Sequence, residues 1–312
     1  MRAIVLREFG QAAELGELPV PEIGPEEFLV RVAAASVNAF DWKIAAGMMA
    51  NNFEFAFPVT IGRDFAGEIV AAGERASGFA VGDQVFGYLS SQRLHQGSLA
   101  EYLPSGNACM TLKPAGLEFR AAAALPLAGM TAMRCVTQLE LGPGKRLLVV
   151  GASGGVGSFI VQLAARAGAS VLATGHTEDA EFLRSLGAAA VIDHRADVAA
   201  QVAQHAPDGL DAVIDLVNRG DDFVASARLT RAGGAAVSTH RQADEQTLAQ
   251  FGVRAVNAAG LPDQGLLEQL GEMAASGQLT VPISGEFTLD HGAQALEFIR
   301  VQHVRGKYVV TV

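Results

Sequence analysis

The sequence predicts an α/β protein in which a doubly wound parallel sheet accompanies a second, strand-rich domain. Across residues 119–275, short runs that are apolar throughout alternate with stretches of helical periodicity, which is typical of a parallel sheet covered on both faces. A glycine-rich turn directly follows the first of these runs. Residues 1–118 instead carry short strand patterns broken by glycine and proline, which indicates a compact β domain.

The middle section predicts the order of the parallel sheet along the chain. Its apolar runs predict strands at 147–150, 170–173, 190–192, 212–214 and 235–237. Its helical periodicity predicts helices at 156–164 and near 179–186, 197–205 and 222–230.

The first and last sections are expected to build one domain together. In the first section, strand patterns occur at 28–32, 68–70 and 84–86. The last section holds one amphipathic helix, through Ala293, Leu296 and Ile299, and a final strand at 307–312. Because this last section is too short to fold alone, the predicted domains are 1–118 with 276–312, and 119–275.

Composition excludes several classes of function. The chain has 312 residues and a formal net charge of −10, which argues against nucleic-acid and anionic-membrane partners. No apolar run is long enough to span a membrane, and the N-terminus shows no secretory pattern, so we expect a cytoplasmic protein. The two cysteines, Cys109 and Cys135, provide neither a disulfide framework nor a cysteine-rich zinc site, and we expect both to be small buried hydrophobes.

The glycine-rich turn lies between a predicted strand and a predicted helix, as a dinucleotide-binding loop requires. Gly154 and Gly155 leave room for a pyrophosphate, and Gly157 lets the helix pack against the strand. The N–H groups and dipole at the helix start favour an anion. The alternative is a tight turn that binds nothing, which the repeated strand–helix units disfavour. We therefore expect a Rossmann-type domain with cofactor contacts from Ala152, Ser153, Gly154, Gly155, Val156 and Gly157.

The end of the second strand favours NADPH over NADH. An NAD site usually carries Asp or Glu there to bind the ribose 2′-hydroxyl. This chain has no acid at that point, which leaves room for a 2′-phosphate and hydrogen-bond donors around it. The acids Glu178 and Asp179 follow closely, and we expect them to complement the next helix N-terminus. The predicted contacts are Thr174, Gly175, His176 and Thr177.

Seven motifs, in order and spacing, carry a resemblance over essentially the whole chain. They lie at 37–43, 62–67, 82–87, 97–102, 125–132, 152–157 and 306–310. With them the chain resembles the medium-chain dehydrogenase/reductase superfamily, and within it the zinc-free quinone oxidoreductase (zeta-crystallin-like) branch. The resemblance implies a GroES-like catalytic domain beside the Rossmann-type domain. It also implies that cofactor contacts come from Thr131, the main chain at Val217 and Ser238, and Gly306-Lys307.

The resemblance also implies the loss of the catalytic zinc site. Zinc-dependent relatives carry a Cys and a Gly-His-Glu, and here Asn38 and Arg63-Asp64 occupy those positions, so we expect no metal. Reduction without a metal suits acceptors whose developing charge is delocalised, such as quinones and α,β-unsaturated carbonyls. We therefore expect an NADPH-dependent quinone or enone reductase.

The candidate catalytic residues each have a structural alternative. Asn38 is a neutral donor or a strand-end cap, and Asp41 lies near the cleft or serves a helix N-terminus. Trp42 lines the substrate pocket or packs in the core. Arg63 stabilises an enolate or pairs with Asp64, and we favour the pair.

The role of Lys307 and the function of the whole protein each have alternatives. Lys307 either reaches a cofactor phosphate or is solvated. The function has two rivals, an NADPH-binding sensor or structural protein without turnover, and an enoyl-thioester reductase. By analogy with the family, we expect a homodimer joined through edge strands of the nucleotide-binding sheet, formed here near 253–256.

Overall fold

The computed structural model describes residues 1–312, and the chain divides into two compact units. Unit 1 comprises Met1–Met130 and Leu261–Val312, and unit 2 comprises Thr131–Gly260. Helix α3 (Pro126–Thr137) contains the point of division.

Unit 1 is mainly β-structure with a few helices around it. Its strands are β1 (Arg2–Leu6), β2 (Glu14–Glu17), β3 (Glu27–Val37), β4 (Glu54–Phe55), β5 (Val59–Thr60), β6 (Asp64–Ala72), β7 (Gln84–Tyr88), β8 (Arg93–Leu94), β9 (Tyr102–Gly106), β10 (Met110–Leu112), β17 (Ile283–Thr288) and β18 (Lys307–Thr311). Its helices are α1 (Ala39–Ala45), α2 (Phe119–Ala124), α9 (Gln264–Ala275) and α10 (Gly292–Val301), with short 3₁₀ turns at Asn107–Cys109 and Leu289–His291.

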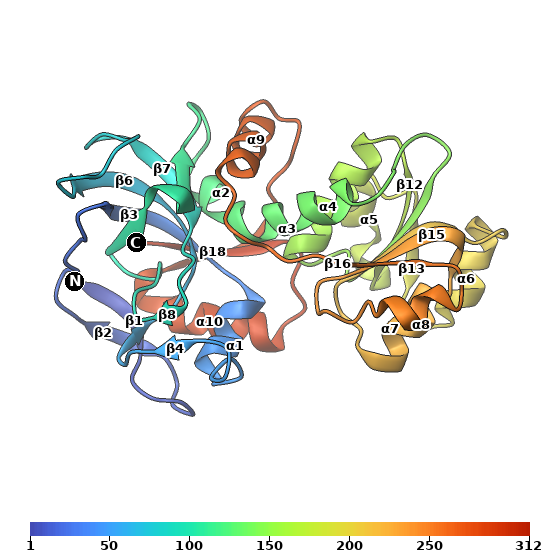
Figure 1. The fold of residues 1–312 in the computed structure, drawn as a ribbon, viewed down its shortest axis with the longest axis horizontal. Helices are drawn as coiled ribbons and strands as arrows, with labels where there is room; N and C mark the ends of the chain where they lie inside the picture. The colour runs from blue at the N-terminus through green and yellow to red at the C-terminus, as the bar shows by residue number, and fades with distance from the viewer. The chain divides into compact units, whose positions relative to one another are not determined.

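The main sheet of unit 1 has seven strands, in the order β10-β7-β6-β3-β18-β17, with β9 also paired to β3. The C-terminal β18 runs antiparallel beside β3, so the last segment of the chain completes a sheet begun near the N-terminus (Figure 1). A second sheet has the order β2-β1-β5. Inward-facing residues of these strands form one buried core that includes Ile4, Phe28, Phe65, Leu103 and Val310.

Unit 2 alternates strands and helices. Its elements are β11 (Arg146–Val150), α4 (Gly155–Arg166), β12 (Ser170–Gly175), a 3₁₀ turn at Thr177–Asp179, α5 (Ala180–Ser185), β13 (Ala190–Asp193), α6 (Val198–His205), β14 (Leu210–Asp215), α7 (Gly220–Ala227), β15 (Thr230–Ser238), α8 (Glu245–Ala249) and β16 (Arg254–Asn257). The six strands pair in parallel in the order β13-β12-β11-β14-β15-β16. The predicted doubly wound fold is therefore confirmed.

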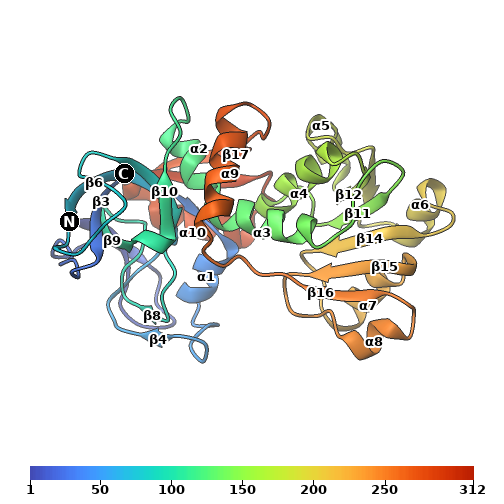
Figure 2. The ribbon, with the colours of Figure 1, turned by 45° about the horizontal axis from the view of Figure 1, so that its top comes forward.

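Helices cover both sides of this sheet, with α4 and α5 on one side and α7 and α8 on the other (Figure 2). The strands are apolar throughout because side chains on both faces of the sheet are buried, as the adjacent Leu148 and Val149 show, which point to opposite faces and are both fully buried. One core joins Leu148 and Leu172 to Val202 of α6, and another joins Ala236 to Phe223 of α7 and Leu248 of α8. Strand order reverses at β11, whose carboxyl end carries the glycine-rich turn.

One predicted helix boundary is shifted. The helix predicted near 222–230 is α7, which begins at Gly220 and ends at Ala227. It stops earlier because Thr230 already belongs to β15, where it pairs with Leu210 of β14. Strand pairing therefore overrides the helical periodicity of these last residues.

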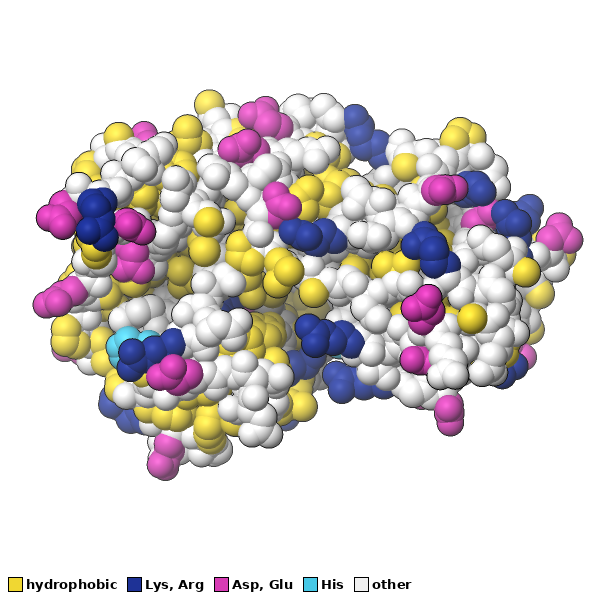
Figure 3. All heavy atoms as spheres, viewed as in Figure 1, with side chains coloured by type: hydrophobic (Ala, Val, Ile, Leu, Met, Phe, Trp, Pro, Cys, Tyr) yellow, Lys and Arg dark blue, Asp and Glu magenta, His cyan; other side chains and the backbone are white.

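The surface mixes both signs of charge. On the face drawn in Figure 3, acidic and basic side chains are interspersed, with hydrophobic side chains between them. None of the helices has the length and apolar character needed to cross a membrane.

Candidate active site and cofactor site

The strand register of unit 1 gathers three motifs at one end of β3. Ser36 of β3 lies opposite Asp64 of β6, and Val37 lies opposite Tyr308 of β18. Because β6 and β18 flank β3 on its two sides, Asp64 and Lys307 both lie next to Asn38, which follows the last residue of β3.

These residues form a buried hydrogen-bonded cluster. The Nδ2 of Asn38 donates to Asp64 Oδ2 over 2.8 Å, and Ser36 Oγ donates to the same oxygen over 3.0 Å. The main-chain N–H of Leu127 donates to Asp64 Oδ1 over 3.0 Å. Lys307 Nζ donates to Asn38 Oδ1 and to the Val37 carbonyl, and lies 3.5 Å from Asp64 Oδ2. The cluster thereby fixes the Asn38 amide in one orientation.

The expected ion pair between Arg63 and Asp64 is wrong. The cation that pairs with Asp64 is Lys307, which is 2 % exposed. Arg63 precedes β6, which begins at Asp64, and its guanidinium lies near the rings of Phe40 and Phe53 instead of at the Asp64 carboxylate. The same burial means that Lys307 is not solvated, and it favours a role inside this cluster over contact with a cofactor phosphate.

Burial shifts the pKa values of the cluster towards the neutral forms. Desolvation raises the pKa of Asp64, and the charge of Lys307 opposes this shift. Desolvation lowers the pKa of Lys307, and Asp64 and Asp41 oppose that shift. Removing either partner of this pair would leave an uncompensated buried charge, which typically costs about 3–5 kcal/mol.

Helix α1 positions two more of the predicted residues. Asp41 is fully buried, and its Oδ2 accepts a 2.7 Å hydrogen bond from the N–H of Asn38 at the helix N-cap. The alternative role of Asp41 at a helix N-terminus is therefore confirmed. Desolvation raises its pKa to about 7. Trp42 is half-buried and lies against Lys43, 6.0 Å from Nζ to the ring centre, so it is not a fully buried core residue.

The Arg63 side chain lies near two aromatic rings. Its guanidinium carbon is 5.8 Å from the ring centre of Phe40 and 6.0 Å from that of Phe53. Arg63 is 3 % exposed, and its Nε has no hydrogen-bond partner. Gly62, at φ +101°, makes the turn that leads into Arg63, because a side chain there would overlap Ser98 and Leu99.

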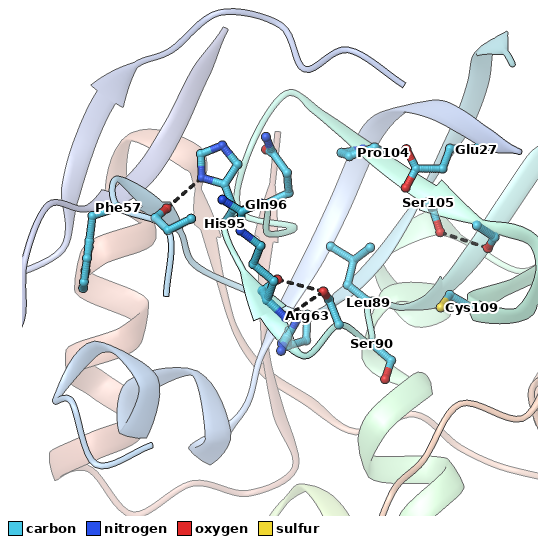
Figure 4. A pocket seen from close by; sticks show the side chains of 14 residues that line it. Glu27, Phe57, Arg63, Leu89, Ser90, His95, Gln96, Pro104, Ser105 and Cys109 are labelled. Atoms are coloured by element: carbon cyan, nitrogen blue, oxygen red, sulfur yellow. Dashed lines mark hydrogen bonds between the residues drawn. The ribbon is translucent and has the colours of Figure 1, made fainter. Parts of the chain in front are cut away.

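A pocket of about 630 Å³ opens beside Arg63 within unit 1. Figure 4 shows Arg63, Leu89 and Ser90 in the middle of the view, His95 on one side and Cys109 on the other. Cys109 is half-buried and lines this pocket, so the expectation that it is a core residue is wrong, whereas Cys135 is buried as expected. The lining residues are Glu27, Ala56, Phe57, Arg63, Leu89, Ser90, Ser91, Arg93, His95, Gln96, Pro104, Ser105, Gly106 and Cys109.

In unit 2, the glycine-rich turn links β11 to α4 as expected. Gly151 has φ +82°, and Gly154 is the N-cap of α4. A Cβ on Gly157 would lie 2.2 Å from the Gly151 carbonyl oxygen, so only glycine allows the helix to approach the turn this closely. A Cβ on Gly154 would meet nothing closer than 3.7 Å. The first turn of α4 directs main-chain N–H groups into this opening, which fits an anionic group.

Two histidines lie at the carboxyl ends of β12 and β13. The rings of His176 and His194 meet edge to face, with centres 4.6 Å apart, and His194 Nδ1 lies 3.2 Å from the Gly175 carbonyl. Thr174 is buried, and its hydroxyl accepts a 3.0 Å hydrogen bond from the Gly151 N–H, so it braces the glycine turn. Thr177 is exposed. No carboxylate side chain ends β12, as the sequence predicts.

The remaining predicted cofactor contacts occupy varied environments. Thr131 lies buried in α3. Val217 is exposed after β14, and Ser238 is buried at the end of β15, where its Oγ accepts from the His240 N–H. Gly306 has φ +88°, and a side chain there would overlap the Pro282 carbonyl, so this glycine shapes the turn before β18.

Comparison with known proteins shows which family this chain belongs to. The family model for the alcohol dehydrogenase GroES-like domain matches residues 24–136, and the model for zinc-binding dehydrogenases matches residues 186–310. Over 99 % of this chain and 79 % of the relative, the chain is 32 % identical to a chloroplastic NADPH-dependent alkenal/one oxidoreductase of Arabidopsis thaliana. The chain belongs to the medium-chain dehydrogenase/reductase superfamily.

Within this superfamily, quinone oxidoreductases are among the similar proteins. A chloroplastic quinone-oxidoreductase of Triphysaria versicolor is 31 % identical over 99 % of this chain and 98 % of the relative. The solved structure of the quinone oxidoreductase from Coxiella burnetii matches with a TM-score of 0.90 and 31 % identity, covering 100 % of this chain and 99 % of the other. The GroES-like fold expected for the catalytic domain is thereby confirmed.

The residues that the resemblance places at zinc-ligand positions are engaged with one another or carry a positive charge. Asn38 and Asp64 are bonded to each other and to Lys307, and Arg63 is a guanidinium. The 312 described residues contain no cluster of three His, Cys, Asp or Glu side chains that could hold a metal ion.

Sequence reasoning missed three features of the site. Ser36 and the buried position of Lys307 follow from strand register, which no local pattern shows. His194 could have been predicted, because it lies two residues beyond the strand predicted at 190–192, and the carboxyl ends of neighbouring parallel strands meet at one sheet edge.

Proposed function

We propose that this chain is an oxidoreductase that transfers hydride from NADPH to a quinone or an α,β-unsaturated carbonyl. The observation that carries the proposal is the buried Asn38–Asp64–Lys307 cluster. It holds a neutral hydrogen-bond donor at the position where zinc-dependent members of the superfamily carry a metal ligand. The two relatives named for alkenal/one and quinone substrates support the same class of acceptor.

The residues of unit 2 fit NADPH. The N-terminus of α4, with Gly154 at its N-cap and open space around it, suits the pyrophosphate. Strand β12 itself ends without an acid, and the nearby Asp179 carboxylate is buried and accepts a 2.9 Å hydrogen bond from the His176 N–H. The side chains of His176 and His194 lie at this strand end as hydrogen-bond donors for a 2′-phosphate. When bound, NADPH supplies the hydride.

The cluster in unit 1 positions a donor for the acceptor's oxygen. Asn38 uses one Nδ2–H on Asp64, and Lys307 occupies its Oδ1, so the second Nδ2–H is the group left to stabilise developing negative charge. Asp64 and Lys307 are positioning residues in this proposal. A proton then reaches the product from water or a nearby acid.

The test is steady-state oxidation of NADPH by a panel of acceptors. We expect turnover with a simple quinone and an alkyl vinyl ketone, lower efficiency with NADH, and no effect of metal chelators. An enoyl thioester in the same panel tests the alternative function, an enoyl-thioester reductase. A trans-enoyl reductase of Aspergillus terreus, 34 % identical over 67 % of this chain, supports that alternative. Tight NADPH binding without turnover of any acceptor would instead identify a binding protein.

The proposal also includes the domains and the assembly. We assign residues 1–118 and 276–312 to the catalytic domain and 119–275 to the NADPH-binding domain. We further propose a cytoplasmic homodimer. Strand β16 supports the dimer, because it ends the six-stranded sheet and leaves one row of main-chain groups unpaired.

A further inference from the structure

Unit 1 contains a buried cation without a partner. The Arg63 guanidinium forms no hydrogen bond or ion pair with any of the 312 described residues, and its Nε is fully enclosed. Its neighbours are the rings of Phe40 and Phe53, which give only a weak attraction to a cation. A buried charge in this state is costly unless an anion completes the site.

The two buried acids near Arg63 form no hydrogen bond or ion pair with it, although Asp41 Oδ1 also has no partner and the charge of Arg63 lowers the pKa of Asp41. Asp64 accepts from Asn38, Ser36 and Leu127 and pairs with Lys307. Asp41 Oδ2 accepts from the Asn38 N–H, and its pKa of about 7 means that this carboxyl is partly protonated at neutral pH. Neither acid therefore supplies Arg63 with a bonded counter-charge.

The pocket beside Arg63 gives an external anion access to it. The other charged groups of its wall already have partners: Arg93 lies 3.4 Å from Glu54, and Glu27 accepts a 2.7 Å hydrogen bond from the Gly24 N–H. His95 is held through Nδ1 by the Ala56 carbonyl at 2.8 Å (Figure 4). Arg63 is thus the one charged lining group that lacks a partner.

We propose that the pocket binds a carboxylate of the acceptor at Arg63, so that the preferred enones or quinones carry a carboxylate away from the reacting carbon. The planar guanidinium fork matches the two oxygens of a carboxylate. The volume of about 630 Å³ exceeds what a carboxylate fills and leaves room for the rest of a small acceptor. This inference rests on the proposed function.

The test compares two acceptors that differ only in charge. One is 5-oxo-6-heptenoate, a vinyl ketone whose carboxylate is separated from the enone by methylene groups, and the other is its methyl ester. We expect kcat/KM for the acid to exceed that for the ester by at least about tenfold in the unmodified protein, mainly through KM. In Arg63→Met the ratio should fall to within about threefold of one.

Arg93→Met is the matched control. It removes the same charge from the same pocket wall, but at an exposed side chain already paired with Glu54, so the preference for the acid should persist. An equal loss of preference in both variants would mean that the preference comes from the total positive charge of the pocket wall, and it would overturn the assignment to Arg63. The melting temperature of Arg63→Met should stay level or rise, because an unpaired buried charge is removed. A large drop together with an unchanged preference would make Arg63 a structural residue and overturn the proposal.

Binding without chemistry separates this inference from the proposed function. Levulinate, a saturated keto acid that cannot accept hydride at an alkene, should bind the unmodified protein and Arg93→Met in calorimetry, and not Arg63→Met. Two results together would overturn the carboxylate site and still support the reductase: the ester is reduced as efficiently as the acid, and levulinate binding does not change in Arg63→Met. Levulinate binding that depends on Arg63, without turnover of either acceptor, would support the carboxylate site and overturn the proposed reductase function.

Discussion

Asp41 shows how burial changes the chemistry of one residue. Its carboxyl group is enclosed at the start of α1, and desolvation outweighs the hydrogen bond from Asn38, so its pKa rises to about 7 from 3.8. A group with a raised pKa in the folded state stabilises the fold fully only below its unfolded pKa. That contribution is lost as the pH rises through the folded value.

Asp41 therefore predicts a pH dependence of stability. Between pH 4 and pH 7, the native state binds more protons at this residue than the unfolded chain, so the free energy of unfolding should fall by up to about 4 kcal/mol. Asp41→Asn keeps an oxygen for the Asn38 N–H and removes the titration. Urea unfolding at several pH values should show a flatter profile for the variant, and parallel profiles would contradict the assignment.

At the scale of elements, the turn between β11 and α4 depends on one close approach. Gly157 in the first turn of α4 faces the main chain of Gly151 and Ala152, where a Cβ would lie 2.2 and 2.6 Å from their atoms. Both obstacles are backbone, so they cannot move aside as a flexible side chain can. Gly154 at the N-cap has open space instead, on the side where we place the cofactor.

The two glycines should respond differently to alanine. Gly157→Ala should lower the free energy of unfolding by roughly 1–3 kcal/mol through overpacking, and weaken NADPH binding by displacing the turn. Gly154→Ala should change stability by no more than about 1 kcal/mol while still weakening NADPH binding. Denaturant unfolding and cofactor titration on both variants check this. Equal destabilisation by the two changes would show that space at Gly157 does not control the turn.

At the scale of the molecule, the exposed edge of the parallel sheet is the feature that bears on assembly. Strand β16 pairs only with β15, and the Ala258 N–H following it bonds the Ser238 carbonyl. Successive N–H groups along a strand point alternately to its two sides. Because the Ala258 N–H points towards β15, the N–H of Ala255 points away from β15. Two copies could pair these edges across a two-fold axis.

The proposed dimer predicts the effect of a proline in that edge. Light scattering on the unmodified protein should give twice the 32.4 kDa mass of one chain. Ala255→Pro removes the outward N–H and should shift the mass towards one chain, whereas Ala255→Ser should not. A single-chain mass for the unmodified protein at micromolar concentration would end the dimer proposal.

The sequence by itself determined the parallel sheet, the nucleotide turn, the missing acid at the end of β12 and the superfamily, because each is expressed in local periodicity or in a short motif. It could not reveal that Lys307 bonds Asn38 and pairs with Asp64, since Lys307 and Asn38 are 269 positions apart and the three residues meet only through the strand order β6-β3-β18. It also misassigned Arg63, because this residue lies in the loop before β6, where tertiary packing and no local pattern sets the direction of a side chain. Only the tertiary structure decided which charges are compensated, since compensation depends on which strands lie side by side. By leaving Arg63 without a partner in a pocket wall, the fold pointed to the carboxylate site.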